Sequence, residues 1–174
     1  MIRPFHGKSP RIAESAYVNE AAYVVGDVEI GEGSNIWPGA VVRGDFGRIR
    51  IGCNVSVEDN CVIHSGTPSS PEGDVEIGDY VHIGHGAVLN GRRIGSHVLI
   101  GMNATVLHDS EIESECIIAA GCVVGQGMIV PARSFVAGVP GKVKGPATEA
   151  QLWWVREAHK EYDKLARRYR SEGL

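Results

Sequence analysis

The chain has 174 residues, a formal net charge of −4 and 23 glycines, and only 6% of its side chains are aromatic. This length suits one domain, and the dispersed charge offers no basic surface for nucleic acid or for an anionic membrane. No apolar run reaches the roughly 18 residues that a membrane span needs, and residues 1–10 lack the apolar core of a secretory signal, so we expect a cytoplasmic protein.

From Val18 onward an aliphatic residue recurs every six residues, with breaks at residues 44–50 and 65–76 and a shorter step before Ile94. Glycine often follows the aliphatic residue, and the fifth position of each hexad is small or β-branched. Such a period is typical of a solenoid with three short faces and three tight corners in each coil. The sequence therefore predicts an all-β solenoid, a left-handed parallel β-helix of hexapeptide repeats, over residues 1–143 with inserted loops at 44–50 and 65–76.

Assigning the hexads in rotation to three faces predicts which residues stack from coil to coil. The first face is headed by Val42, Ile63, Leu89 and Val106, the second by Ile36, Val57, Ile83 and Ile100, and the third by Ile30, Ile51, Ile77 and Ile94. The residue after each inward aliphatic points outward. Arg43, His64 and Asn90 should therefore be neighbours on the first face, and Asp59 should stack with His85 on the second.

The cysteines occupy structural positions in this scheme. Cys61, Cys116 and Cys122 share the small corner position of the hexad, and the chain has no CxxC spacing. We expect these residues to be buried in the corners and to form neither disulfides nor metal ligands.

Residues 144–174 form a linker and an amphipathic helix in this interpretation. Thr148 and Gln151 have the spacing of a capping box, which marks the start of the helix. An apolar stripe then recurs at spacings of three and four: Leu152, Val155, His159, Tyr162, Ala166 and Tyr169. We expect this stripe to lie against the coils or a neighbouring subunit, with Trp153 and Trp154 at its packing edge.

Several of these segments resemble the γ-class carbonic anhydrases. The resemblance rests on Arg43-Gly44-Asp45, Ile51-Gly52, Glu58-Asp59-Asn60, His64 and Ile83-Gly84-His85-Gly86, and it continues through residues 137–143 to the helix. It implies a homotrimer in which three histidines bind a divalent metal at each subunit interface, two from one subunit and one from its neighbour. The resemblance implies that this metal is zinc, or iron or cobalt. His64 matches the first ligand and His85 the ligand donated across the interface, while Asn90 stands at the third ligand position, where the family has histidine.

The resemblance also implies a reaction, the reversible hydration of carbon dioxide to bicarbonate by a metal-bound hydroxide. It implies that Arg43 and Asp45 hold the interface together, that Asp59 orients a ligand, and that Glu58 stands where the family commonly has a glutamine that orients the hydroxide. An amide oxygen is a poorer zinc ligand than imidazole, so Asn90 predicts a weak or inactive site unless His82 or His108 supplies the third ligand. Glu72, Asp74 and Glu76 are candidate proton shuttles, although solvated loop charges are the simpler interpretation.

Two further functions fit the same repeat. Hexapeptide acyltransferases and thioesterases that act on coenzyme A esters share the hexads, and residues 138–142 resemble their terminal coil. A non-catalytic trimeric scaffold needs no site at all. Metal analysis would separate the first function from these two, and binding of coenzyme A would separate the second from the third. The sequence leaves the metal and the physiological substrate open.

Overall fold

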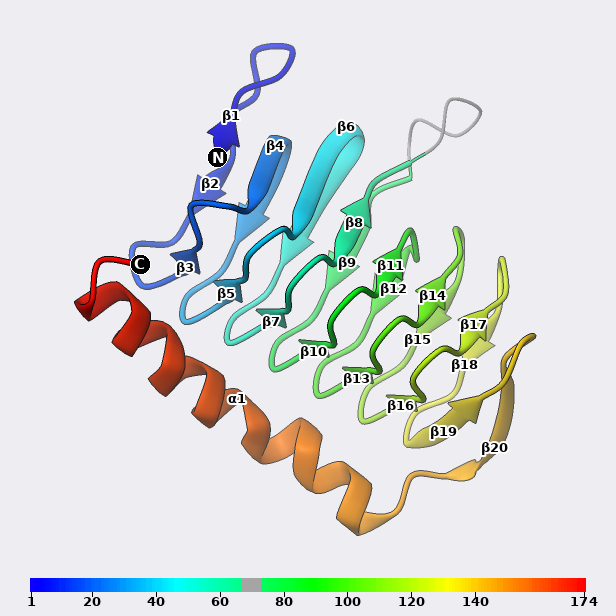
Figure 1. Ribbon diagram of the computed structural model, residues 1–174. Helices are drawn as coiled ribbons and strands as arrows, with labels where there is room; N and C mark the ends of the chain where they lie inside the picture. Colours follow the sequence, from blue (N-terminus) through cyan, green and yellow to red (C-terminus); the bar gives the residue numbers. More distant parts are fainter. Residues whose placement is uncertain (67–72) are drawn as a thin grey trace.

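The computed structural model describes residues 1–66 and 73–174, and it confirms the predicted fold. The chain winds as a left-handed parallel β-helix whose short strands pair from coil to coil, and one long C-terminal helix runs alongside the coils (Figure 1). No helix among the described residues is long and apolar enough to cross a bilayer.

The strands fall into three faces. The first face holds β1 (Ile2–Arg3), β8 (Val62–His64), β11 (Val88–Leu89), β14 (Thr105–Val106) and β17 (Val123–Val124). The second face holds β3 (Tyr17–Val18), β5 (Asn35–Ile36), β7 (Ser56–Val57), β10 (His82–Ile83), β13 (Leu99–Ile100), β16 (Ile117–Ile118), β19 (Ser134–Ala137) and the antiparallel β20 (Lys142–Pro146). The third face holds β2 (Arg11–Ile12), β9 (Val75–Ile77), β12 (Arg93–Ile94), β15 (Glu111–Ile112) and β18 (Ile129–Val130). Two longer strands, β4 (Tyr23–Ile30) and β6 (Val41–Ile51), pass through a corner and join the first face to the third.

The strand register agrees with the face assignment made from the hexads. Ile63 lies between Val42 and Leu89 on the first face, and the corresponding pairs on the other two faces are also in register. All these aliphatic residues point inward and are buried. Burial of each such side chain contributes about 1.5–3 kcal/mol, so the stacked core provides most of the stability of the coils.

Residues in the left-handed backbone region form the corners. Gly39 (φ 73°) and Asn60 (φ 59°) occupy equivalent corners of successive coils, and a Cβ on Gly39 would lie 2.3 Å from Asn60 Oδ1. Glycine and asparagine adopt this conformation at the lowest cost, which explains their recurrence at fixed offsets. The corner cysteines are buried free thiols, as predicted, and burial raises the pKa of Cys61 to about 12.

The insertion at residues 44–50 was expected to be a loop, and this expectation was wrong. It is part of β6, which pairs with β4 at both of its ends, up to Gly44 and again from Ile49, with an irregularity in register between Gly26 and Val28. The side chain of Ile49 within the insertion is completely buried. The added residues therefore carry the strand around a corner: the Gly47 and Arg48 N–H groups donate to the side chains of Ser65 and Asp74, and Ile49 adds an apolar side chain to the core.

Helix α1 (Glu149–Ser171) begins with the predicted capping box between Thr148 and Gln151. It runs along the second face, where Leu152 and Val155 pack against Ile117 and its neighbours. Further along the helix, Tyr162, Ala166 and Tyr169 pack against Tyr17 and Trp37. The predicted stripe is therefore the packed face of α1.

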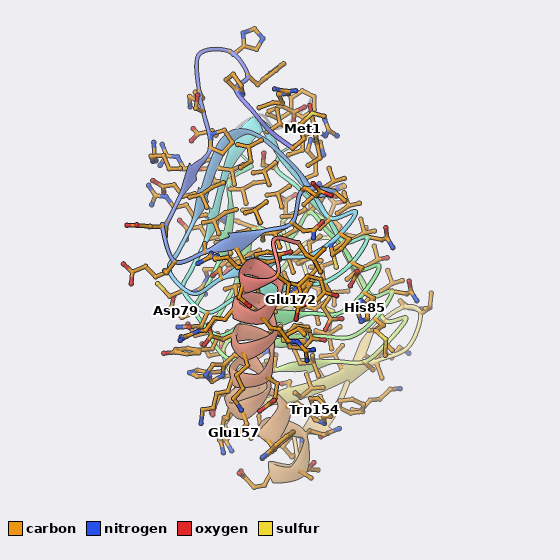
Figure 2. All side chains as sticks on the ribbon, turned by 60° about the vertical axis from the view of Figure 1, so that its left-hand side comes forward. Met1, Asp79, His85, Trp154, Glu157 and Glu172 are labelled. Atoms are coloured by element: carbon orange, nitrogen blue, oxygen red, sulfur yellow. The ribbon has the colours of Figure 1, made fainter. Side chains whose placement is uncertain are left out.

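Trp153 and Trp154 do not lie at the packing edge of the helix. They are 52% and 54% exposed, and their rings contact each other edge to face with centroids 5.3 Å apart. The helix rotates them away from the coils because Leu152 and Val155, one position to either side, occupy the packed face. Figure 2 shows Trp154 at the surface of α1.

The third face carries charges of alternating sign in the position before each inward aliphatic residue. From coil to coil the register runs Arg11, Glu29, Arg50, Glu76, Arg93 and Glu111. Ion pairs join Arg11 to Glu29, Arg50 to Glu29 at 3.1 Å, and Arg93 to Glu111 at 3.2 Å. We call this row the charge ladder.

Candidate functional site

The predicted neighbours on the first face do lie side by side. Arg43 is in register with His64 on the adjoining strand, and Asn90 follows Leu89, which pairs with Ile63. His64 Nε2 lies 2.8 Å from Asp45 Oδ1, and its Nδ1 lies 3.3 Å from Arg43 Nη2. These contacts join the predicted metal ligand His64 to the Arg43–Asp45 pair.

Asp45 is ionised in this arrangement. Burial alone would raise its pKa, but hydrogen bonds from His64 and Arg43 hold the pKa below its usual value. The charged carboxylate is a strong acceptor for the His64 ring. Asp45 therefore fixes the orientation of that imidazole.

Asn90 presents its amide to the same place. Its Nδ2 donates a hydrogen bond of 2.9 Å to the backbone carbonyl of His64. Because the amide nitrogen faces this carbonyl, the amide oxygen is the Asn90 atom that a cation could reach. His108, one of the two alternative ligands considered, lies in the turn after β14 and is half-buried.

His85 lies on the other side of a corner, in the turn after β10. Its side chain is 50% exposed, with Nδ1 2.9 Å from Asp59 Oδ2 and Nε2 3.0 Å from Glu58 Oε2. Figure 2 shows the His85 side chain at the surface, beyond the edge of α1. Asp59 and His85 therefore stack on the second face as predicted, and the imidazole remains accessible.

Glu58 is buried, with a side chain only 4% exposed, and sequence reasoning missed the residues that surround it. Its Oε1 accepts hydrogen bonds from His82 Nε2 at 2.7 Å and from the Tyr162 hydroxyl of α1. Its Oε2 accepts a 2.8 Å hydrogen bond from the His85 backbone N–H. Burial would raise the pKa of Glu58, but the hydrogen bonds from His82 and Tyr162 lower it below its usual value.

This network also shows why His82 does not lie in the Asn90 position. The His82 ring is buried under α1 with its centroid 4.7 Å from that of Tyr162, on the second face rather than the first. Tyr162 belongs to the apolar stripe of the helix, so its periodicity gave no sign of a polar contact. Burial and the hydrogen bond to Glu58 raise the pKa of Tyr162, which keeps its hydroxyl a donor.

The candidate proton shuttles separate in space. Asp74 lines a surface hollow of about 350 Å³ together with Asp45 and Phe46, and it accepts a hydrogen bond from the Arg48 backbone N–H at 2.8 Å. Glu76 belongs to the charge ladder on the third face, away from the stack of Arg43, His64 and Asn90 on the first. Glu72 lies outside the described residues.

Within residues 1–66 and 73–174, one chain holds no group of three His, Cys, Asp or Glu side chains placed to bind a metal ion. His64 and His85 belong to different faces of the coil, as the hexads predicted.

Comparison with known proteins defines the family. Residues 9–44 and 93–126 match the sequence family described as bacterial transferase hexapeptide (six repeats). The carnitine operon protein CaiE of Salmonella agona is 35% identical over 96% of this chain and 82% of its own length. The mitochondrial γ carbonic anhydrase 2 of Arabidopsis thaliana is 34% identical over 95% of this chain, which spans only 60% of the plant protein. A hexapeptide transferase family protein from Anaplasma phagocytophilum, 32% identical, superposes with a TM-score of 0.90 over 97% of both chains. The chain belongs to the γ-carbonic-anhydrase-like family of hexapeptide-repeat proteins.

Proposed function

We propose that this protein is a γ-carbonic-anhydrase-like metalloprotein that hydrates carbon dioxide reversibly to bicarbonate at sites shared between the subunits of a homotrimer. The observation that supports this most directly is the outward stack of Arg43, His64 and Asn90, in which Asp45 orients His64. The similarity to a γ carbonic anhydrase adds support. The predicted cytoplasmic location stays a prediction, because that plant relative is named as mitochondrial.

The donor groups fit a divalent metal, with fewer imidazoles than the family uses. His64 and Asn90 of one subunit and His85 of its neighbour would hold it, and both imidazoles lie against carboxylates. Carboxylates in this position fix the tautomer and orientation of metal-binding histidines. Zinc, or iron or cobalt, would supply a water whose pKa falls to about 7, and hence a nucleophile at neutral pH.

The chain's own residues then have separate tasks. Asp45 is hydrogen-bonded to His64 and Asp59 lies 2.9 Å from His85 Nδ1, so each carboxylate would orient one ring. Arg43 lies against both Asp45 and His64 and keeps positive charge beside the place where bicarbonate would form. Asp74, at the rim of the hollow next to Asp45, is the best placed described carboxylate for moving a proton to solvent.

The test is to measure the metal content of protein purified without added metal and again after reconstitution with zinc, iron(II) or cobalt(II). Stopped-flow measurement of carbon dioxide hydration on the same samples completes it. Stoichiometric metal with slow hydration is the expected result. Absence of metal binding under all conditions would overturn the proposal.

Both histidines should be essential for metal binding. His64→Ala or His85→Ala should each abolish metal occupancy, because a site already short of one imidazole cannot lose another. His97→Asn is the matched control, since His97 lies in a left-handed corner (φ 56°) that asparagine tolerates. Metal analysis of the three variants checks the prediction, and unchanged occupancy in both alanine variants would place the metal elsewhere.

The assembly is tested separately. Light scattering at micromolar concentration should give the mass of three chains, because the ligands His64 and His85 come from different faces. The Arg43→Ala trimer should be weaker, and should dissociate at protein concentrations at which the wild-type trimer is still intact. The reason is that Asp45 would lose its cationic partner at the proposed interface. Arg93→Ala removes an equivalent arginine from the charge ladder and should leave the mass unchanged. A stable wild-type monomer would contradict the shared site.

Acyl transfer to or from a coenzyme A ester is the second candidate, favoured by the similarity to a protein named as a hexapeptide transferase. A shared fold does not by itself carry the chemistry. Coenzyme A should raise the melting temperature in a thermal-shift assay if this candidate is right. If neither metal nor coenzyme A binds, a non-catalytic scaffold is the better interpretation.

A further inference from the structure

Glu58 is an unusual acceptor, because three hydrogen-bond donors converge on one buried carboxylate. The His82 ring and the Tyr162 hydroxyl donate to Oε1, and the backbone N–H of His85 donates to Oε2. The His85 ring nitrogen Nε2 also lies 3.0 Å from Oε2. These donors come from strand β10, helix α1 and the turn after β10. A single side chain thus joins the helix to the residue proposed as a metal ligand.

The chemistry of the donors explains why a glutamate occupies this position. An ionised carboxylate offers lone pairs on both oxygens and no hydrogen, whereas a glutamine amide presents two N–H donors in place of one oxygen. Because donors contact both oxygens of Glu58, the amide nitrogen of a glutamine would place its N–H groups against one set of these donors. An ionised glutamate accepts from the whole set, and its Oε2 in return holds the His85 backbone.

We propose that Tyr162 and His82 are positioning residues that act through Glu58 to hold His85 in place, so that helix α1 is part of the site. The assignment of His85 as a metal ligand rests on the proposed function, while the clamp itself rests on the geometry of the single chain. The helix does not need the Tyr162 hydroxyl in order to dock. Leu152 and Val155 are completely or almost completely buried on its packed face, and the Tyr162 ring also lies against Trp37.

Tyr162→Phe tests the clamp because it removes only the hydroxyl that donates to Glu58. Tyr169→Phe is the matched control, since Tyr169 is on the same helix and its ring also packs against Trp37, with centroids 5.1 Å apart. The first measurement is amide hydrogen exchange by NMR in protein without metal. The reporter is the His85 amide, which donates to Glu58, and the reference is the Gly84 amide, which donates to the Ile100 carbonyl in the strand ladder.

In Tyr162→Phe the His85 amide should exchange about tenfold faster or more, because a hydrogen bond to a charged group is worth at least that factor. The Gly84 amide should be unchanged, and so should both amides in Tyr169→Phe. A general loss of stability would instead accelerate both amides together. Equal His85 exchange in the wild type and in Tyr162→Phe would overturn the proposal.

The second measurement is cobalt(II) affinity, followed by the visible absorption of the bound ion. Tyr162→Phe should weaken binding by about tenfold to a hundredfold, the usual effect of losing a group that supports a metal ligand. Tyr169→Phe should bind like the wild type. Cobalt affinity equal in the two variants would overturn the role toward the metal. If the wild type binds no cobalt, the proposed function fails, and the exchange measurement still decides whether the clamp exists.

Discussion

Asn90→His should convert a weak metal site into a tight one and raise carbon dioxide hydration above the wild-type rate. The side chain of residue 90 already lies beside His64, since Leu89 pairs with Ile63 and the Asn90 amide contacts the His64 carbonyl. Four-ligand zinc sites are worth roughly 10–16 kcal/mol, or about 3 kcal/mol a ligand, so one more imidazole should tighten binding by about two orders of magnitude. Competition with a chelator of known affinity measures this change.

Leu107→His is the matched control for that variant. Leu107 occupies the same position of the hexad one coil further along, where Val106 pairs with Leu89. An imidazole there lies a strand spacing beyond residue 90 and should leave metal affinity unchanged. If the wild type already holds one full equivalent of zinc and hydrates carbon dioxide as fast as Asn90→His, the site is not impaired and residue 90 needs no imidazole.

Glu58→Gln should destabilise the protein by about 3 kcal/mol, because at least one donor of the buried cluster would then face an N–H group without an acceptor. The glutamine that is common in the family at this position is thus expected to lower the free energy of unfolding of this protein. The measurement is urea unfolding at a fixed protein concentration, since assembly would also contribute to stability.

Asp59→Asn supplies the comparison for Glu58→Gln. Asp59 is the adjacent carboxylate and also contacts the His85 ring, but its side chain is 39% exposed and water can replace the lost acceptor. Its effect should stay within about 0.5 kcal/mol. Equal losses in the two variants would mean that burial of Glu58 contributes nothing specific.

The stacking of the site was predictable because it follows from a count of residues. Once Ile63 and Leu89 are assigned to one face, the positions of His64 and Asn90 follow, and the structure agrees. The sequence also showed that Glu58 replaces the glutamine common in the family, but it did not show why a carboxylate is needed there. That reason lies in Tyr162, whose place in the apolar stripe of α1 hides the polar contact of its hydroxyl.

The insertion at residues 44–50 shows a different limit. A break in the hexad period says that residues have been added and gives no information on whether they pair. Here Ile49 decides the outcome by filling a core position, and the insertion becomes part of β6. The exposure of Trp153 and Trp154 was missed because their size and apolar character favoured burial, although the stripe through Leu152 and Val155 already left both on the outer side of the helix.

The charge ladder marks successive coils alternately with a positive and a negative side chain. The hexads are so alike that a folding chain could skip one coil and still bury an aliphatic residue at every position. Such a slip would set Glu29 against Glu76, or Arg50 against Arg93, instead of the observed opposite charges. Like charges directly opposite on paired strands are destabilising, so the misthreaded helix is penalised at the junction where the coil has been skipped. The buried aliphatic residues are alike in every coil and cannot specify which coils are neighbours. The exposed charges can, because their sign alternates from one coil to the next.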